Sequence, residues 1–140
     1  MIVLDTNVLS ELMRPSPADA VVRWVSRGPM RSYFTTTVSQ AEIVHGVLLL
    51  PPGRRRDRLE ALARVMFDEE FAGRVLAFGT DAALMYARIA ADRSRAGRPI
   101  SQFDAQIAAI ARSAGASLAT RNARDFEDCG IDVIDPWSAR

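Results

Sequence analysis

The chain contains no lysine, one cysteine and one histidine among its 140 residues. The absence of lysine excludes every mechanism that needs a side-chain amine. The lone Cys129 cannot form a disulfide within the chain, and one histidine with one cysteine cannot build a zinc site from soft ligands. Any metal ion that this protein binds is therefore expected to have oxygen ligands.

Long apolar segments are also missing. No run reaches the roughly 18 residues that a membrane span requires, and the amino terminus lacks a basic leader followed by an apolar stretch. We therefore expect no membrane association and a cytoplasmic location. The composition is 49% hydrophobic and 25% charged, which predicts one domain spanning residues 1–140. A net charge of +1 argues against a protein that coats nucleic acid nonspecifically. An acidic centre flanked by arginines could nevertheless sum to the same net charge.

Strand-like and helix-like segments alternate along the chain. Strands are expected at residues 2–4, 33–36, 75–78, 117–120 and 131–134, and helices at 8–13, 16–28, 39–50, 59–67, 80–95 and 101–115, with a helical turn at 123–128. Parallel neighbours need a crossover connection, which is usually a helix. The order therefore predicts an α/β fold of three layers, α/β/α, around a mostly parallel sheet of about five strands.

Four acidic residues fall where predicted strands end or helices begin: Asp5, Glu42, Asp104 and Asp125. Ligands of parallel α/β sheets bind beyond the carboxyl ends of the strands, where carboxylates would repel one another unless a divalent cation joined them. Mg²⁺ and Mn²⁺ prefer such hard oxygen ligands. This pattern favours a metal-dependent nuclease. Spacing alone does not place Asp104, because its helix follows another helix.

Structural roles compete with the catalytic ones. The segments Ser39-x-x-Glu42 and Ser101-x-x-Asp104 both have the form of a helix capping box. Asp5 is different, because it ends an apolar strand and is expected to gain nothing there without a partner. Asp5 is therefore the strongest single candidate for a metal ligand.

One histidine and two tryptophans have simpler interpretations. His45 lies one helical turn after Glu42, but the Glu-x-x-His spacing occurs once in this chain, whereas carboxylate-bridged iron bundles need it twice. A structural role for His45 is therefore favoured. Trp24 and Trp137 are expected to be packing residues.

The chain resembles the PIN-domain ribonucleases of the VapC toxin type, essentially from end to end. Four segments carry the resemblance in this order: VLDTN at 3–7, SQAE at 39–42, ISQFD at 100–104 and LATRNARDF at 118–126. The resemblance implies a PIN-like fold and hydrolysis of RNA phosphodiester bonds with Mg²⁺ or Mn²⁺. It also implies that Asp5, Glu42 and Asp104 are the main metal-site carboxylates.

The fourth position of the implied site departs from the family pattern. Many relatives have an aspartate where this chain has Asn122, and Asp125 follows three residues later. Either residue could complete the catalytic site, or neither touches metal directly. A surface salt bridge is an equally good interpretation of Asp125, which lies among charged neighbours.

The resemblance also implies partners. They are an RNA substrate, a second copy of the chain in a homodimer, and a small antitoxin protein whose tail occupies the acidic groove, with promoter DNA bound only through the antitoxin. Arg14, Arg121 and Arg124 neighbour the proposed site in sequence and are candidates for binding RNA phosphates. The run of arginines at 54–56 with Arg58 is either a solvated helix face or a further RNA contact.

Other classes of protein fit less well. A phosphoaspartyl enzyme or receiver module also places an aspartate after its first strand, but it normally uses a lysine, which this chain lacks. A nucleotide-binding α/β protein would have a glycine-rich turn there, and residues 5–8 contain no glycine. The main alternative is a non-catalytic PIN-like module that binds RNA or a protein partner.

Overall fold

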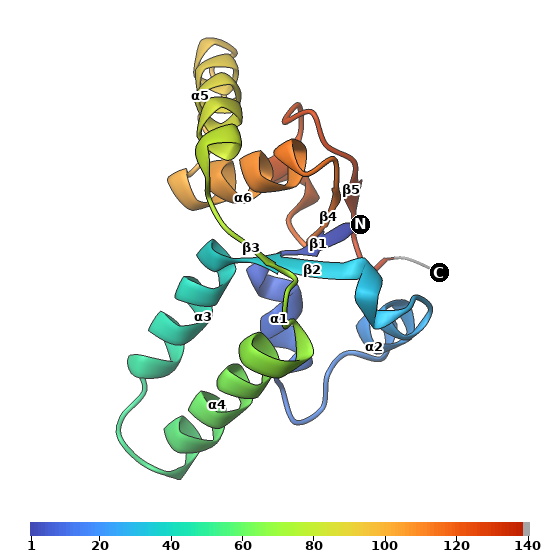
Figure 1. The fold of residues 1–140 in the computed structure, drawn as a ribbon, viewed down its shortest axis with the longest axis vertical. Helices are drawn as coiled ribbons and strands as arrows, with labels where there is room; N and C mark the ends of the chain where they lie inside the picture. The colour runs from blue at the N-terminus through green and yellow to red at the C-terminus, as the bar shows by residue number, and fades with distance from the viewer. Residues whose placement is uncertain (139–140) are drawn as a thin grey trace.

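The computed structural model describes residues 1–138, in which five short strands form one parallel sheet (Figure 1). The strands are β1 (Ile2–Leu4), β2 (Tyr33–Thr36), β3 (Val75–Leu76), β4 (Ser117–Ala119) and β5 (Val133–Ile134). Their order across the sheet is β3-β2-β1-β4-β5, and every neighbouring pair is parallel. The predicted sheet is thus confirmed, with β1 at its centre and the carboxyl ends of β1, β2 and β4 at the same edge.

Helices cover both faces of this sheet, as the predicted three-layer α/β/α fold requires. They are α1 (Thr6–Leu12), α2 (Asp19–Ser26), α3 (Thr37–Leu48), α4 (Arg54–Val65), α5 (Thr80–Arg95) and α6 (Gln102–Ser113), with shorter helical turns η1 (Met30–Ser32), η2 (Met66–Glu70) and η3 (Ala123–Phe126). In Figure 1, α5 and α6 lie above the sheet and α1, α2 and α4 lie below it. Two hydrophobic cores result, one on each face.

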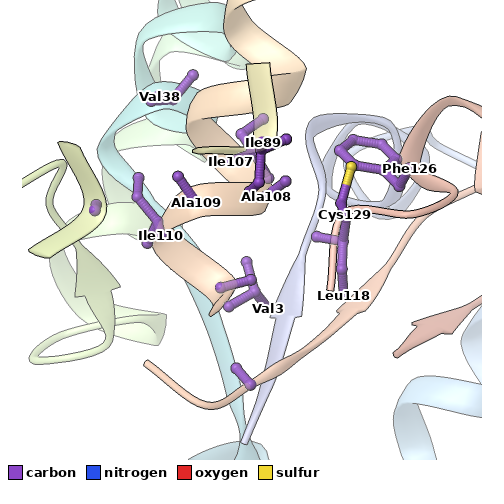
Figure 2. Packing of buried hydrophobic residues seen from close by; sticks show 13 residues of the cluster. Val3, Val38, Ile89, Ile107, Ala108, Ala109, Ile110, Leu118, Phe126 and Cys129 are labelled. Carbon is purple, nitrogen blue, oxygen red and sulfur yellow. The ribbon is translucent and has the colours of Figure 1, made fainter. Parts of the chain in front are cut away.

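The central strand contributes to both cores because successive side chains of a strand point to opposite faces. Val3 belongs to the core beneath α5 and α6, whereas Leu4 belongs to the core beside α1 and α2. Figure 2 shows Val3 facing α6, whose buried face includes the small residues Ala108 and Ala109. Small side chains let α6 lie close to the strands, and this packing fixes the start of α6 at the carboxyl edge of the sheet.

Four helices begin elsewhere than the sequence predicted. Helix α1 begins two residues earlier and α4 five residues earlier than expected, and α2 and α3 differ in their caps. The cap of α3 is Thr36, whose hydroxyl accepts a hydrogen bond from the N–H of Ser39 at 3.0 Å. Ser39 therefore lies inside the first turn, and Glu42 lies in the second turn rather than the first. Helix α2 begins at Asp19 without a side-chain cap. Ser16 is not needed there, because the N–H of Ala18 donates to Glu11 Oε2 at 2.9 Å.

Two further features of the helices bear on the surface of the molecule. Phe103, in the first turn of α6, is 54% exposed. No helix within residues 1–138 has both the length and the apolar character that crossing a bilayer requires.

Candidate active site

A groove of about 500 Å³ opens at the carboxyl edge of the sheet, and four carboxylates line it, those of Asp5, Glu11, Glu42 and Asp104. Asp5 reaches it from the end of β1, Glu42 from α3 and Asp104 from the first turn of α6. These residues are far apart in sequence and converge because parallel strands end at one edge. We call this cavity the acidic groove.

Asp5 is 5% exposed and caps helix α1. Its Oδ1 accepts a hydrogen bond from the N–H of Thr6 at 2.8 Å. The sequence-based view that Asp5 gains nothing at this position was therefore wrong: the residue that ends β1 also starts α1, because only one residue separates the two elements.

The second oxygen of Asp5 connects β1 to β4. The Thr120 hydroxyl donates to Asp5 Oδ2 at 2.7 Å, and Asn7 Nδ2 lies 3.4 Å from the same oxygen. Thr120 Oγ1 also accepts hydrogen bonds from Asn7 Nδ2 and from the N–H of Asn122, each at 3.1 Å. Because two N–H groups occupy the lone pairs of this hydroxyl, its single proton is directed at Asp5.

Glu42 is held by a pair of hydroxyl groups. Thr6 Oγ1 lies 2.8 Å from Glu42 Oε1 and 2.9 Å from Ser39 Oγ. An ionised carboxylate only accepts, so Thr6 donates its one proton to Glu42 and is left to accept from Ser39. The first-turn position of Ser39 in α3 thus serves the groove rather than the helix end.

Asp104 is half-buried, and its backbone supports a true helix cap. Ser101 caps α6 by accepting a hydrogen bond from the N–H of Asp104 at 3.2 Å. The predicted cap is thus present, and it leaves the Asp104 carboxylate free to line the acidic groove. Capping and a position in the groove are compatible, because capping uses the backbone N–H of Asp104 and the groove its side chain.

The pKa values of Asp5 and Asp104 are both raised, first of all by burial. Burial raises the pKa of Asp5 to about 6, the charges of Asp104 and Glu42 add to this effect, and the hydrogen bonds from Thr120 and Thr6 oppose it. Burial likewise raises the pKa of Asp104; the Ser101 hydrogen bond opposes it, the charge of Asp125 adds to it, and the nearby Arg93 opposes it. Within residues 1–138, no arginine forms an ion pair with Asp5 or Asp104.

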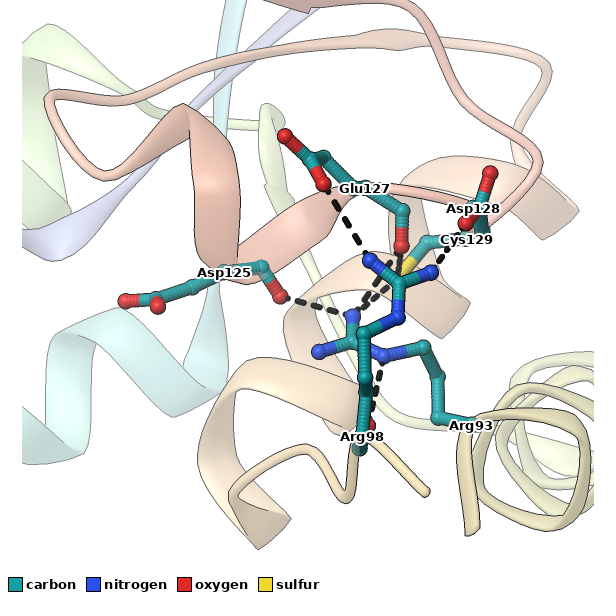
Figure 3. A network of polar contacts seen from close by, with 6 residues as sticks. All are labelled: Arg93, Arg98, Asp125, Glu127, Asp128 and Cys129. Atoms are coloured by element: carbon teal, nitrogen blue, oxygen red, sulfur yellow. Dashed lines mark hydrogen bonds and ion pairs between the residues drawn. The ribbon is translucent and has the colours of Figure 1, made fainter. Parts of the chain in front are cut away.

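The two candidates for the fourth position are placed differently. Asn122 lines the acidic groove, whereas Asp125 is exposed and lies outside its lining. The carboxylate of Asp125 points away from Arg93, which binds the Asp125 backbone oxygen at 2.9 Å (Figure 3). Among the described residues Asp125 has no ion pair either, so the salt bridge considered for it is absent there.

The turn η3, which carries Asp125, is held by a buried arginine that sequence reasoning missed. Arg93 of α5 is 6% exposed and donates to the carbonyl oxygens of Arg98 at 2.7 Å, Asp125 at 2.9 Å and Glu127 at 3.0 Å. Arg98 pairs with Glu127 at 3.2 Å and also with Asp128 (Figure 3). The only sequence signal for Arg93 is a charged residue at a core-facing position of a regular helix.

Of the arginines predicted to bind phosphate, Arg14 and Arg121 line the acidic groove and Arg124 does not. A second, largely apolar groove of about 440 Å³ runs between α1, α3 and α4, and Arg55 and Arg58 line it. The two grooves share Thr6, Ser10, Arg14 and Glu42, so they are continuous. His45 is exposed and lines neither groove, in line with its structural interpretation.

Glu11 and Trp137 are among the residues that line the acidic groove without having been predicted to do so. Glu11 is 7% exposed and holds both the N–H of Ala18 and, at 3.4 Å, the guanidinium of Arg14. Trp137, interpreted from sequence as a packing residue, does contact the core but also lines the groove. Its position depends on how the carboxyl-terminal segment returns past β1, which no local pattern encodes.

The donors of the groove fit a hard cation that retains water. No three aspartate, glutamate, histidine or cysteine side chains within the described part of the chain are close enough together to hold a metal ion by themselves. Mg²⁺ commonly keeps several waters and takes only one or two carboxylates directly. The carboxylates, hydroxyls and amide of the groove offer hard oxygen atoms, and the buried Asp5 has no cationic partner among the described residues.

Comparison with known proteins agrees with this architecture. The chain is 37% identical to the VapC ribonuclease Y4jK of Sinorhizobium fredii, with 98% of each chain covered, and 34% identical to the toxin FitB of Neisseria gonorrhoeae, with 98% and 99% covered. The structure of FitAB bound to an IR36 DNA fragment superposes with a TM-score of 0.90 at 34% identity, covering 100% of this chain and 98% of that one. The model of the PIN domain matches residues 2–131. This chain belongs to the PIN domain family.

Proposed function

We propose that residues 1–140 form one PIN domain that acts as a metal-dependent endoribonuclease, the toxin of a toxin–antitoxin pair. The observation that carries this proposal is the convergence of Asp5, Glu42 and Asp104 on one groove, where among the described residues no arginine pairs with Asp5 or Asp104. Similarity to a VapC ribonuclease and to the toxin FitB supports the assignment.

The groove supplies the parts that such a reaction needs. Asp5, Glu42 and Asp104 would hold the ion, in part through its bound water, and Asn122, which lines the same groove, would complete the set. A bound Mg²⁺ or Mn²⁺ supplies Lewis-acid chemistry at a phosphodiester. The Thr120 and Thr6 hydroxyls keep the Asp5 and Glu42 carboxylates oriented. Asp125 acts from outside the groove, through its charge on Asp104.

Substrate phosphates would be neutralised by the arginines that border the acids. Arg14 and Arg121 line the groove beside the carboxylates, and a guanidinium binds a phosphate through paired N–H donors. Arg14 is oriented by its ion pair with the buried Glu11. Arg124 is left out of this assignment because it does not line the groove.

Asp5→Asn tests the assignment directly. We expect cleavage of single-stranded RNA in Mn²⁺ to fall by roughly 10²–10³-fold or more, the scale observed when one preorganised electrostatic contact is removed. Added Mn²⁺ should raise the melting temperature of the unaltered protein by mass action and should raise that of the variant much less. Asp132→Asn is the control, because Asp132 is exposed and precedes β5 at the opposite edge of the sheet.

The alternative is a non-catalytic PIN-like module that binds RNA or a protein. Purified protein, free of inhibitor, that gains stability from Mn²⁺ but leaves single-stranded and structured RNAs intact would favour the module. Full activity in a folded Asp5→Asn variant would refute the assignment of Asp5 as a metal ligand of the nuclease.

An antitoxin partner follows from the relatives and fits the second groove. The apolar groove carries Met13, Ile43 and Val47 on its walls and ends at Thr6 and Glu42 of the acidic groove. A small antitoxin that packs apolar side chains there would place its tail over the acids and block substrate. Binding of promoter DNA would belong to this complex, as in the FitAB structure that contains DNA, and not to the isolated chain.

A homodimer is the proposed assembly of the toxin itself. Leu84, in the second turn of α5, is 60% exposed, and Phe78, two residues before that helix, is 38% exposed. Burial of these side chains against a second copy would remove apolar surface from water. Light scattering coupled to gel filtration should give twice the mass of one chain, and Leu84→Glu should give a folded monomer.

A further inference from the structure

One aromatic residue and one arginine form a stacked pair inside the acidic groove. The guanidinium carbon of Arg121 lies 5.1 Å from the centre of the Trp137 ring, within the range of a cation–π contact. Both residues line the groove that also contains Asp5, Glu42 and Asp104. The pair is therefore next to the place where a substrate phosphate would be attacked.

Trp137 is anchored from two sides. Its backbone N–H donates to Asp135 Oδ1 at 2.9 Å, and the preceding Pro136 is buried. The indole is partly buried against the core that contains Leu4 and Leu9. Packing against the core would not by itself require Trp137 to border the groove as well.

Arg121 is anchored through its backbone and keeps its side chain available. Its N–H donates to Asn7 Oδ1 at 3.2 Å, and Asn7 in turn donates to the Thr120 hydroxyl that holds Asp5. Within residues 1–138 the Arg121 guanidinium forms no ion pair. The backbone of Arg121 is thus tied to the residues that hold Asp5, and its guanidinium is a planar cation without a carboxylate partner among residues 1–138.

We propose that the Arg121–Trp137 pair binds an unpaired nucleobase of the RNA strand, adjacent to the phosphate bound in the acidic groove. This inference rests on the proposed function and adds a base-binding subsite to it. Single-stranded RNA is commonly recognised by stacking of splayed bases on aromatic rings and on guanidinium planes. A guanidinium placed over an indole can offer its face to a base and its N–H edge to the flanking phosphate.

The alternative role for Arg121 is contact with phosphate alone, which any cation of suitable reach would provide. The two roles differ in what the ligand must contain. Base stacking requires a nucleobase and a planar cation, whereas phosphate contact requires only charge. An experiment that removes the bases, or the planarity, therefore separates the two.

Binding is measured in the double variant Asp5→Asn, Trp24→Phe, which does not cut the probe and retains Trp137 as its one tryptophan. A short single-stranded RNA is titrated while the Trp137 fluorescence is followed, and an abasic ribose-phosphate strand of equal length is titrated as the matched ligand. We expect saturable quenching by the RNA and affinity about tenfold weaker for the abasic strand, since that strand offers no base to stack. Equal affinity for the two strands would overturn the proposal.

Substitutions in the otherwise unaltered enzyme provide the second readout. Arg121→Met and Arg121→Lys should raise the KM for single-stranded RNA by a similar factor, about tenfold, with little change in kcat, because lysine keeps the charge but loses the plane. Full rescue by lysine would reassign Arg121 to phosphate binding. Arg23→Met is the control for charge, because Arg23 is exposed on α2. Trp137→Leu should behave as Arg121→Met does, with its folding checked by thermal melting.

These results separate the subsite from the catalytic assignment. A protein that cleaves RNA but binds the abasic strand equally well refutes the base-binding subsite and leaves the nuclease intact. A protein that does not cleave RNA in Mn²⁺, yet prefers the strand with bases, retains the subsite on a binding module. An antitoxin that binds the Arg121→Lys variant as tightly as the unaltered protein is the expected result, because the pair is assigned to RNA.

Discussion

The two sides of the acidic groove are built in different ways. On the strand side, Asp5 is 5% exposed, and both of its oxygens accept hydrogen bonds from Thr6, Thr120 and Asn7. On the helix side, the carboxylate of Asp104 is half-buried, and the backbone N–H of the same residue donates to the Ser101 hydroxyl that caps α6. The neighbouring Asp125 is exposed, and Arg93 holds its turn by donating to backbone carbonyl oxygens.

The difference teaches how the site divides its tasks. The strand side keeps its carboxylate in one orientation before any ligand arrives, at the expense of burying a charge. The helix side leaves its acids room to adjust, and its position depends on one buried cation. Substitutions on the two sides should therefore have different effects. On the strand side they should change how the unfolding free energy depends on pH, and on the helix side they should make the backbone less rigid.

The largest effect on stability is expected from Arg93→Met. The substitution leaves the carbonyl groups of Arg98, Asp125 and Glu127 without this donor, and a hydrogen bond from a charged group contributes about 1.5–3 kcal/mol. We expect the free energy of unfolding to fall by on the order of 4 kcal/mol in urea titrations, with faster hydrogen exchange in residues 123–129. Arg95→Met should change neither, because Arg95 is exposed and pairs only with Asp92.

The next largest effect is the dependence of stability on pH through Asp5. Its pKa is raised in the folded protein from 3.8 to about 6, so the folded state holds the Asp5 proton more tightly than the unfolded state. The contribution is stabilising below about pH 4 and is lost as the pH rises through 6, which amounts to about 3 kcal/mol. Without metal, the unfolding free energy of the protein should therefore fall by this amount relative to that of Asp5→Asn between pH 3.5 and 7.

That comparison has a clear opposite outcome. If the difference between the two proteins stays constant across this range, or grows in favour of the unaltered protein, Asp5 is not a buried, unpaired acid. Asp132→Asn should show no such trend, since Asp132 is exposed.

A smaller effect is expected from Thr120→Val, which preserves shape but removes the hydroxyl. The hydrogen bond from Thr120 lowers the pKa of Asp5, so its loss should move that pKa further upward and extend the fall in stability to higher pH. The unfolding free energy at pH 7 should drop by about 2 kcal/mol. Thr37→Val, at an exposed position beside the cap of α3, should leave the pH profile unchanged.

The smallest effect is expected on the helix side, from Ser101→Ala. Loss of this cap should cost about 1 kcal/mol of unfolding free energy, and the pKa of Asp104 should rise because the Ser101 hydrogen bond lowers it. The pKa of Asp104 can be followed by its carboxyl NMR shift. A drop in stability as large as that of Thr120→Val would show that the two sides are equally rigid and would remove the distinction drawn between them.

Periodicity and turn residues were sufficient for much of the fold. The bounds of β2 and α5 agree with their predicted ranges, because β-branched and aromatic residues mark the former and a helix with clear stop signals marks the latter. The cap of α3 was misplaced, since Thr36 ends β2 and starts α3 at once and a capping-box pattern at Ser39 competes with it. The start of α2 was misplaced because its partner, Glu11, lies on another helix.

Asp5 and Glu42 could be named from sequence because strand ends meet at one edge, whereas Asp104 was assigned from the family resemblance. The groups that support these acids could not be named from sequence. Thr120 acts on Asp5 across a strand pair, and Arg93 reaches η3 from a helix 32 residues away in sequence. Trp137 enters the groove only through the return of the carboxyl-terminal segment. Each of these contacts depends on tertiary placement and leaves no mark in local sequence.

The place of β1 in the strand order has a consequence for how the molecule fluctuates. With β2 and β4 paired on either side of it, β1 can be released only after a neighbouring strand has separated. The main-chain amide of Asp5 donates to the Ala119 oxygen at 2.9 Å. Partial opening that starts at the outer strands β3 or β5 would leave this amide among the last to lose its protection from hydrogen exchange. The residue on which the proposed chemistry depends thus belongs to the part of the protein that should remain folded longest.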